Sequence, residues 1–176
     1  MKKLYTMLLL VISLCTASCS DWLDVSPSNQ VNGDKLFEIG DGYRNALNGI
    51  YLNLGTSSMY GQTMSWGFMD AIAQYYKTDN GSNFIPKTSA YYKSAKFQFE
   101  DSDVKTFISN IWSVSYNNIA NCNNLILNVS EASPSVFKEG EFEKNMIWGE
   151  ALALRAFMHF DLLRLFAPAI SKDDGK

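Results

Sequence analysis

The sequence predicts an all-α fold. Three long stretches, about residues 34–54, 104–129 and 141–166, place apolar side chains at steps of three and four residues, as one face of an amphipathic helix requires. Strand-like alternation of apolar and polar residues is unconvincing, with the weak exception of Ser94–Phe99. A chain with 47% hydrophobic and 19% charged residues has the composition of a folded globular protein.

Two helices are predicted in the first half of the chain. One covers about Asp34–Leu54, where Gly40 and Gly42 weaken the beginning, so the secure part starts near Asp41. Its apolar face consists of Phe37, Tyr43, Leu47, Ile50, Tyr51 and Leu54. The second covers about Gln62–Tyr76, with Trp66, Met69, Ala73 and Tyr76 on one face and Phe68, Ile72 and Tyr75 beside them. An apolar arc this wide predicts a helix packed on two sides.

The third predicted helix, about Val104–Val129, has the clearest pattern. Its seam consists of Ile108, Ile111, Ser115, Ile119, Cys122, Ile126 and Val129. Away from the seam, five asparagines recur at helical spacing: Asn110, Asn117, Asn121, Asn124 and Asn128. Asparagine is a mediocre helix former, so this row is either a solvated face or a surface that hydrogen-bonds a neighbouring helix or a polar ligand.

The fourth predicted helix covers about Glu141–Phe166 and stops before Pro168. Its core stripe consists of Ile147, Ala151, Leu154, Met158, Leu162 and Leu165. Ala156, Phe160 and Pro168 match the offsets in the second half of a tetratricopeptide repeat. The helices are therefore expected to form repeat-like hairpins, although no fixed period recurs along the chain.

The N-terminus has the layout of a secretory signal. Lys2 and Lys3 precede an apolar run and the small residues 16–18, so residues 1–18 are expected to be removed. Small residues directly before Cys19 resemble a bacterial lipobox, which predicts lipidation of Cys19 and an extended lipidated leader at residues 19–33. The alternative is an ordinary secreted protein with a thiol near its start.

Charge and composition exclude several classes of protein. A formal net charge of −3 argues against nucleic-acid binding. A single histidine, His159, excludes sites that need two, and we expect it to be a packed core residue. Cys122 is expected to be a small buried side chain. No metal or cofactor is predicted, because Asp79, Asp101 and Asp103 lack the spacing of a calcium loop.

Three stretches of the sequence carry motifs of a known family. The helix GEALALRAFMHFDLLRLFAPA, residues 149–169, resembles the Gly-Glu-Ala-x-x-Leu-Arg-Ala helix of the SusD/RagB family of outer-membrane nutrient-binding lipoproteins, with Ala167 where a glycine is usual. The leader CSDWLDVSP resembles the family's start. SYNNIANCNNLI, residues 115–126, resembles its Tyr-x-x-Ile-x-x-Ala-Asn helix, with Cys122 in place of the alanine.

The resemblance implies a fold and a function. The fold would be tetratricopeptide-like hairpins in a right-handed superhelix, with residues 34–176 as the N-terminal part of a longer helical domain. The protein would be a non-enzymatic lipoprotein, anchored on the outer face of the outer membrane. It would bind oligosaccharides and deliver them to a SusC-like TonB-dependent transporter. Glu150 and Arg155 would be structural ion-pairing residues. The alternatives are a helical lid subunit for that transporter and a peptide-binding member of the family.

The ligand site is predicted in the long loop Tyr75–Phe99, which follows the second helix and combines aromatic with polar side chains. Aromatic faces stack on sugar rings, while amides and carboxylates bond hydroxyl groups. The candidate residues are Asp70, Tyr75, Tyr76, Asp79, Asn80, Asn83, Phe84, Tyr91 and Tyr92. Aromatic residues of a long loop also serve to pin it to the core, which is the alternative for each of them.

Overall fold

A computed structural model describes residues 33–78 and 85–168, and within them the regular structure is entirely helical. The prediction of an all-α fold is therefore confirmed. The chain divides into two units, residues 1–35 and 36–176, and of the first unit only the start of helix α2 (Gly33–Leu36) is described. None of the described helices is long and apolar enough to cross a membrane.

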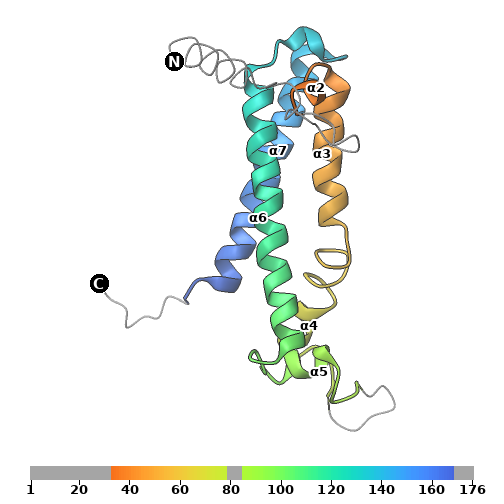
Figure 1. The fold of residues 1–176 in the computed structure, drawn as a ribbon, viewed down its shortest axis with the longest axis vertical. Coiled ribbons are helices and arrows are strands. Elements are labelled where there is room, and N and C mark those ends of the chain that lie inside the picture. Colours follow the sequence, from red (N-terminus) through yellow and green to blue (C-terminus); the bar gives the residue numbers. More distant parts are fainter. Residues whose placement is uncertain (1–32, 79–84, 169–176) are drawn as a thin grey trace, which may run out of the picture. The chain divides into compact units, whose positions relative to one another are not determined.

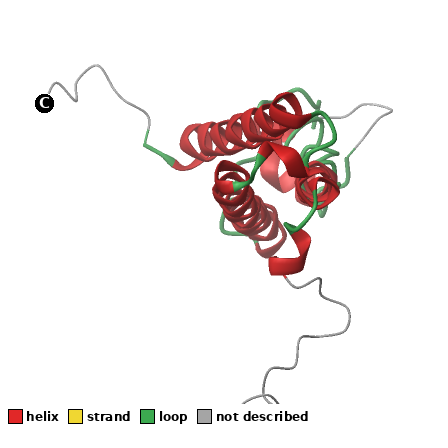
Figure 2. Cartoon of the chain, turned by 90° about the horizontal axis from the view of Figure 1, so that it is seen from above, coloured by secondary structure: helices red, strands yellow, loops and turns green. Residues whose placement is uncertain are grey.

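Three long helices organise residues 36–168. Helix α6 (Ser102–Glu131) and helix α7 (Gly140–Phe166) form a hairpin, and helix α3 (Gly40–Leu54) packs against both (Figure 1). The hairpin turns through the short 3-10 helix η2 (Pro134–Val136), and α7 begins at Gly140 with a φ of 59°, a conformation that favours glycine. Seen from above, the described residues are helices and loops only (Figure 2).

The predicted apolar faces supply the core between these helices. Tyr43 and Leu47 of α3 are buried, as are Ile119 and Cys122 of α6 and Met158 of α7. Fully buried Asn118 was not predicted; its Nδ2 donates to the backbone oxygen of Val114 at 3.0 Å. The buried position of Cys122 is confirmed, and burial raises the pKa of its thiol to about 11.

Two predicted helices have different boundaries in the structure. The first predicted helix is interrupted at residues 37–39, which form a turn between α2 and α3. This turn brings the carbonyl oxygen of Leu36 so close to Gly42 that a side chain there would overlap with it. The prediction of the second helix, about Gln62–Tyr76, is wrong over most of its length. Only helix α4 (Phe68–Ile72) forms within it, and residues 55–67 are successive turns. The residues of the apolar arc are thus divided among helix α4, the stretch that follows α4, and the turns, which contain Trp66.

The predicted loop Tyr75–Phe99 is also partly wrong. Helix α5 (Ala90–Ala95) forms within it, capped by the side chain of Ser89, which accepts from the backbone nitrogen of Tyr91 at 3.3 Å. The suggested strand at Ser94–Phe99 does not form: the first two residues end α5, and Phe97 has a φ of 56°. Short helices of this length carry too few apolar repeats to be seen in a sequence.

Exposed polar contacts join the helices beside the core. Glu150 accepts a hydrogen bond from the hydroxyl of Tyr51 at 2.9 Å, and Arg155 donates to Oδ1 of Asn123 at 2.9 Å. The prediction that Glu150 and Arg155 are ion-pairing residues is therefore corrected: each bonds a neutral side chain on another helix. These contacts hold α7 to α3 and to α6, respectively.

The predicted polar features of α6 and α7 have mixed outcomes. Asn117 and Asn121 are exposed and bond each other within α6 at 3.3 Å, in agreement with a solvated face. His159 was expected in the core but is exposed, with 6.4 Å between the centroids of its ring and that of Tyr116. Helical periodicity placed His159 beside aromatic residues, and these turn out to line the outside of the hairpin.

Candidate functional site

The candidate site is built on the turns at residues 55–67. A side chain at Gly61 would meet the carbonyl oxygen of Gly55 at 2.4 Å, and one at Gly67 would meet that of Gln62 at 2.8 Å. Glycine is therefore needed at both positions for the backbone to approach this closely. The turn ending at Gly67 leaves the preceding residue, Trp66, 57% exposed.

Trp66 lies in a cleft of about 210 Å³ that brings together three separate segments of the chain. The lining residues are Trp66, Gly67, Tyr76, Ile85 and Tyr91. They come from the turns before α4, from the stretch that follows α4, and from α5. The cleft thus gathers aromatic side chains that are up to 25 residues apart in the sequence, Trp66 and Tyr91 being the extremes.

Tyr91 is held in place from two directions. Its ring stacks on that of Phe107 in α6, with 5.4 Å between centroids and 25° between planes. Its hydroxyl oxygen accepts from Nε2 of Gln62 at 2.8 Å. A ring fixed in this way loses little conformational entropy when a ligand binds beside it.

Tyr76 is tied to the same wall of the cleft. Its hydroxyl donates to the backbone oxygen of Trp66. Its pKa is raised by burial and further by the negative charge of Asp70 and by Tyr91.

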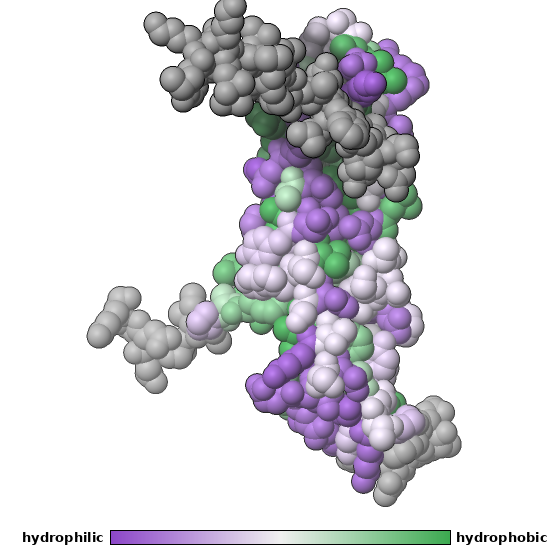
Figure 3. All heavy atoms as spheres, viewed as in Figure 1, coloured by the Kyte–Doolittle hydropathy of each residue, from purple (hydrophilic) through white to green (hydrophobic). Residues whose placement is uncertain are grey.

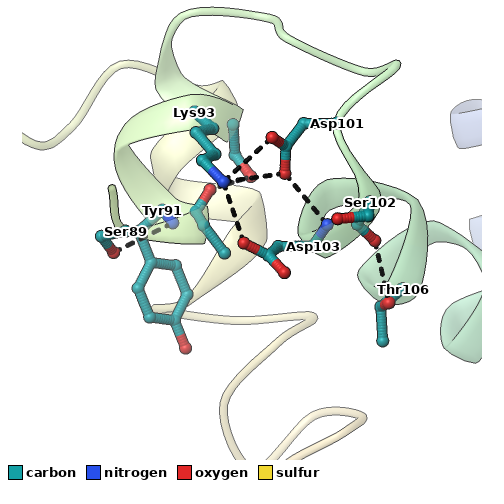
Figure 4. A network of polar contacts seen from close by, with 9 residues as sticks. Ser89, Tyr91, Lys93, Asp101, Ser102, Asp103 and Thr106 are labelled. Carbon is teal, nitrogen blue, oxygen red and sulfur yellow. Dashed lines mark hydrogen bonds and ion pairs between the residues drawn. The ribbon is translucent and has the colours of Figure 1, made fainter. Parts of the chain in front are cut away.

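Helix α5, which carries Tyr91, is clamped to the start of α6 by one lysine. Nζ of Lys93 lies 2.9 Å from Oδ2 of Asp101 and 2.9 Å from Oδ2 of Asp103, while Asp101 also caps α6 (Figure 4). Hydrogen bonds to Asp103 and Asp101 raise the pKa of Lys93, and the bond from Lys93 holds the pKa of Asp101 below its usual range. Two of the three aspartates that were considered for calcium, Asp101 and Asp103, thus bind a lysine.

The structure brings together two of the predicted ligand residues, Tyr76 and Tyr91, which line the cleft. Asp70 is not among the lining residues, although its negative charge contributes to the raised pKa of Tyr76. Tyr75, 79% exposed, and Tyr92, whose ring lies 5.7 Å from Nζ of Lys96, are not among the lining residues. Four further candidates lie outside the described residues: Asp79, Asn80, Asn83 and Phe84.

Sequence reasoning missed Trp66 and Ile85. Trp66 was placed on a buried helical face, because it falls in step with Met69 and Tyr76. A usable signal was present: glycines at 55, 61 and 67 recur every six residues, which is unfavourable for a helix and marks turns. A tryptophan directly before such a glycine is a candidate for exposure.

The arrangement suits the binding of a ligand with flat apolar faces. Three aromatic side chains around one cleft offer the kind of surface on which sugar rings stack. Among residues 33–78 and 85–168, no group of three metal-ligating side chains is close enough to hold an ion.

A comparison with protein families finds a match over most of the chain. The model of a SusD-like family, described as starch-binding and associating with the outer membrane, matches residues 21–175. No curated protein and no solved structure matches the chain. The match includes the turns, α4 and α5, and therefore the whole cleft.

Proposed function

The chain belongs to the SusD-like family of starch-binding proteins associated with the outer membrane, and from this premise we propose that the cleft of Trp66, Tyr76 and Tyr91 binds an oligosaccharide. The observation that supports the proposal is the convergence of three aromatic residues from separate segments on one open cleft. Its volume of about 210 Å³ is below the roughly 300–1,000 Å³ of pockets that enclose a drug-sized ligand. The cleft therefore accommodates part of a glycan chain and leaves the rest outside.

Calorimetric titration with starch-derived oligosaccharides tests this function. Each stacked ring contributes on the order of 1 kcal/mol, so Trp66→Ala is expected to weaken binding roughly fivefold to tenfold. Trp148→Ala is the matched control, since Trp148 is 38% exposed on α7 and does not line the cleft. Equal affinity of Trp66→Ala and the parent protein would exclude the cleft as the site.

Two alternatives within the same family give different results. A peptide-binding protein would ignore every glycan in the titration and bind peptides, with Trp66→Ala still reducing affinity. A lid subunit that does not contact the substrate would bind neither glycans nor peptides in the titration, and Trp66→Ala would leave glycan uptake by cells unchanged. Trp66 is better suited to this comparison than Tyr91, whose ring also packs on Phe107.

We further propose that Cys19 is lipidated and anchors the protein to the outer face of the outer membrane, beside a SusC-like TonB-dependent transporter. The small residues before Cys19 and the family's association with the outer membrane support this. Cys19 lies outside the described residues. Metabolic labelling with palmitate should be lost in Cys19→Ala and kept in Cys15→Ala, and the transporter should co-purify with the labelled protein.

A further inference from the structure

The three segments around the cleft are joined to one another by three hydrogen bonds. Nε2 of Gln62 joins the turns to α5, because it donates to the hydroxyl of Tyr91 at 2.8 Å. Nε2 of Gln74 joins the stretch that follows α4 to α5, because it donates to the backbone oxygen of Ala95 at 2.6 Å. The hydroxyl of Tyr76 joins that same stretch to the turns. Each segment is thus bonded to both of the others.

Helix α5 depends on such polar contacts for its position. It has six residues, of which only Ser94 and Ala95 are buried. Hydrophilic residues gather on the surface at the end of the molecule where α5 and the start of α6 lie (Figure 3). A helix this short is not stable by itself, and one that buries so little apolar surface is held mainly by specific contacts.

Gln74 has a backbone conformation that favours glycine. Its φ is 64°, and it directly follows Ala73, the C-cap of α4. The backbone nitrogen of Gln74 donates to the oxygen of Ala71 at 3.2 Å, and the next nitrogen donates to the oxygen of Asp70 at 3.0 Å, which is a Schellman motif. Glycine is the usual residue at this position, because other residues are strained there. The reason for a glutamine therefore has to lie in its side chain.

The side chain of Gln74 satisfies a buried carbonyl group of α5. Ala95 is 2% exposed and lies in the last turn of α5, where backbone oxygens have no partner inside the helix. Nε2 of Gln74 also donates to the backbone oxygen of Ala71 at 3.3 Å, so one amide group bonds both segments. Ala95 follows Tyr91 by four residues, which places both on the same face of α5. The bond therefore fixes the helix turn that presents Tyr91 to the cleft.

We propose that Gln74 is a positioning residue of the cleft, which fixes α5 against the stretch that follows α4 before a ligand binds. Gln74 does not line the cleft, so it acts through Tyr76, two residues further along the chain, and through Tyr91. Strained backbone of this kind clusters at binding sites. A cleft whose walls are already fixed loses less conformational entropy on binding. The effect on affinity rests on the proposed function, whereas the effect on the unliganded cleft does not.

Calorimetric titration of Gln74→Met and Gln74→Gly separates positioning from a structural role. Both substitutions remove the bond to Ala95, and both should weaken oligosaccharide binding by roughly threefold to tenfold. Both variants should fold, because Lys93 still fastens α5 to α6. Methionine keeps the strained φ and glycine relieves it, so the urea midpoint of Gln74→Gly should lie above that of Gln74→Met. If affinity instead rises with stability and returns to the parent value in Gln74→Gly, the proposal is wrong.

Phe97→Gly is the matched control. Phe97 has a φ of 56° and follows α5 in the same motif: its nitrogen donates to the oxygen of Ser94 at 2.9 Å, and the next nitrogen donates to that of Lys93 at 3.0 Å. Its side chain is a hydrocarbon, which cannot donate a hydrogen bond, and it does not line the cleft. Phe97→Gly should leave oligosaccharide affinity within about twofold of the parent value. Equal losses in Phe97→Gly and Gln74→Gly would overturn the proposal.

Hydrogen exchange of the unliganded protein, followed by mass spectrometry, tests the same bond without a glycan. Amide protons of α5 should exchange roughly threefold to tenfold faster in both Gln74 variants than in the parent, but no faster in Phe97→Gly. Unchanged exchange in the Gln74 variants would overturn the proposal, whatever the titration shows. Faster exchange together with a parent protein that binds no glycan would support the role of Gln74 in fixing the cleft and refute the proposed function.

Discussion

Replacing Tyr60 by phenylalanine tests the contact that fastens the turns at residues 55–67 to α7. The hydroxyl of Tyr60 donates to Oδ2 of Asp161 at 2.6 Å, and Asp161 is only 3% exposed. The other carboxylate oxygen accepts from Nε of Arg164 at 2.7 Å. Removing the hydroxyl leaves Oδ2 of the buried Asp161 carboxylate without the hydrogen-bond donor that Tyr60 provides.

The expected loss is about 2 kcal/mol in the free energy of unfolding, because hydrogen bonds to charged groups contribute roughly 1.5–3 kcal/mol. Phenylalanine retains the ring, which lies 5.1 Å from that of Phe157, so no cavity adds to the loss. For a chain of 176 residues this corresponds to a decrease in Tm of about 4–8 °C.

Urea denaturation provides the measurement, and the midpoint should fall while the slope m stays constant. Tyr116→Phe, at an exposed position of α6, is the matched control and should remain within about 0.5 kcal/mol of the parent protein. In a double-mutant cycle, Tyr60→Phe should cost much less once Asp161→Asn is present. Additive losses, or a change below about 0.5 kcal/mol for Tyr60→Phe alone, would refute a stabilising bond.

The same bond has a consequence at alkaline pH. Burial, and then the hydrogen bond to Asp161, raise the pKa of Tyr60 above its ordinary value of 10.0. A group whose pKa is higher in the folded than in the unfolded state stabilises the fold fully at pH values below its unfolded-state pKa. This contribution is lost as the pH rises through its folded-state pKa. Above about pH 10, the stability difference between Tyr60→Phe and the parent should therefore narrow.

Three other tests concern a charged pair, two glycines and a buried thiol. The pKa of Glu143 is lowered, chiefly by the hydrogen bond from Arg44 of α3. Glu143→Gln should therefore lower the free energy of unfolding at neutral pH, and its difference from the parent protein should vanish as the pH falls below about 4. Urea denaturation at several pH values measures this. Gly49→Ala should raise stability by up to about 1 kcal/mol, whereas Gly42→Ala should lower it sharply because of the carbonyl oxygen of Leu36; opposite shifts in Tm check this. The thiol of Cys122, with its pKa near 11, should resist maleimide at pH 8 until denaturant unfolds the chain, and rapid labelling of the folded protein would contradict its burial.

The long helices could be predicted because each repeats its pattern many times. Helix α6 spans 30 residues and α7 spans 27, so chance agreement with a three- and four-residue step is small. Helices α4 and α5, of five and six residues, contain less than two turns each and give no such signal. Their boundaries depend instead on glycine positions, on the Ser89 cap and on packing against α6.

The candidate site could likewise be predicted only in part. Residue type alone selected Tyr76, Tyr91 and Asp70, because aromatic and acidic side chains in one segment suit a polar ligand with apolar faces. Whether a ring reaches the surface depends on turn geometry, which is why Trp66 was assigned to the core and is 57% exposed. Tyr75 shows the converse: it has the right chemistry and the greatest exposure, but it does not line the cleft.

The sequence by itself determined the helical class of this protein, the packed faces of its three long helices and, through its motifs, its membership of a family. These properties depend on local periodicity and on residue identity, which are present in the chain before it folds. The tertiary structure decided which aromatic side chains meet in a cleft and which charged groups bond neutral partners. Those outcomes depend on contacts between residues far apart in the chain, such as Tyr51 and Glu150, whose geometry no local pattern encodes.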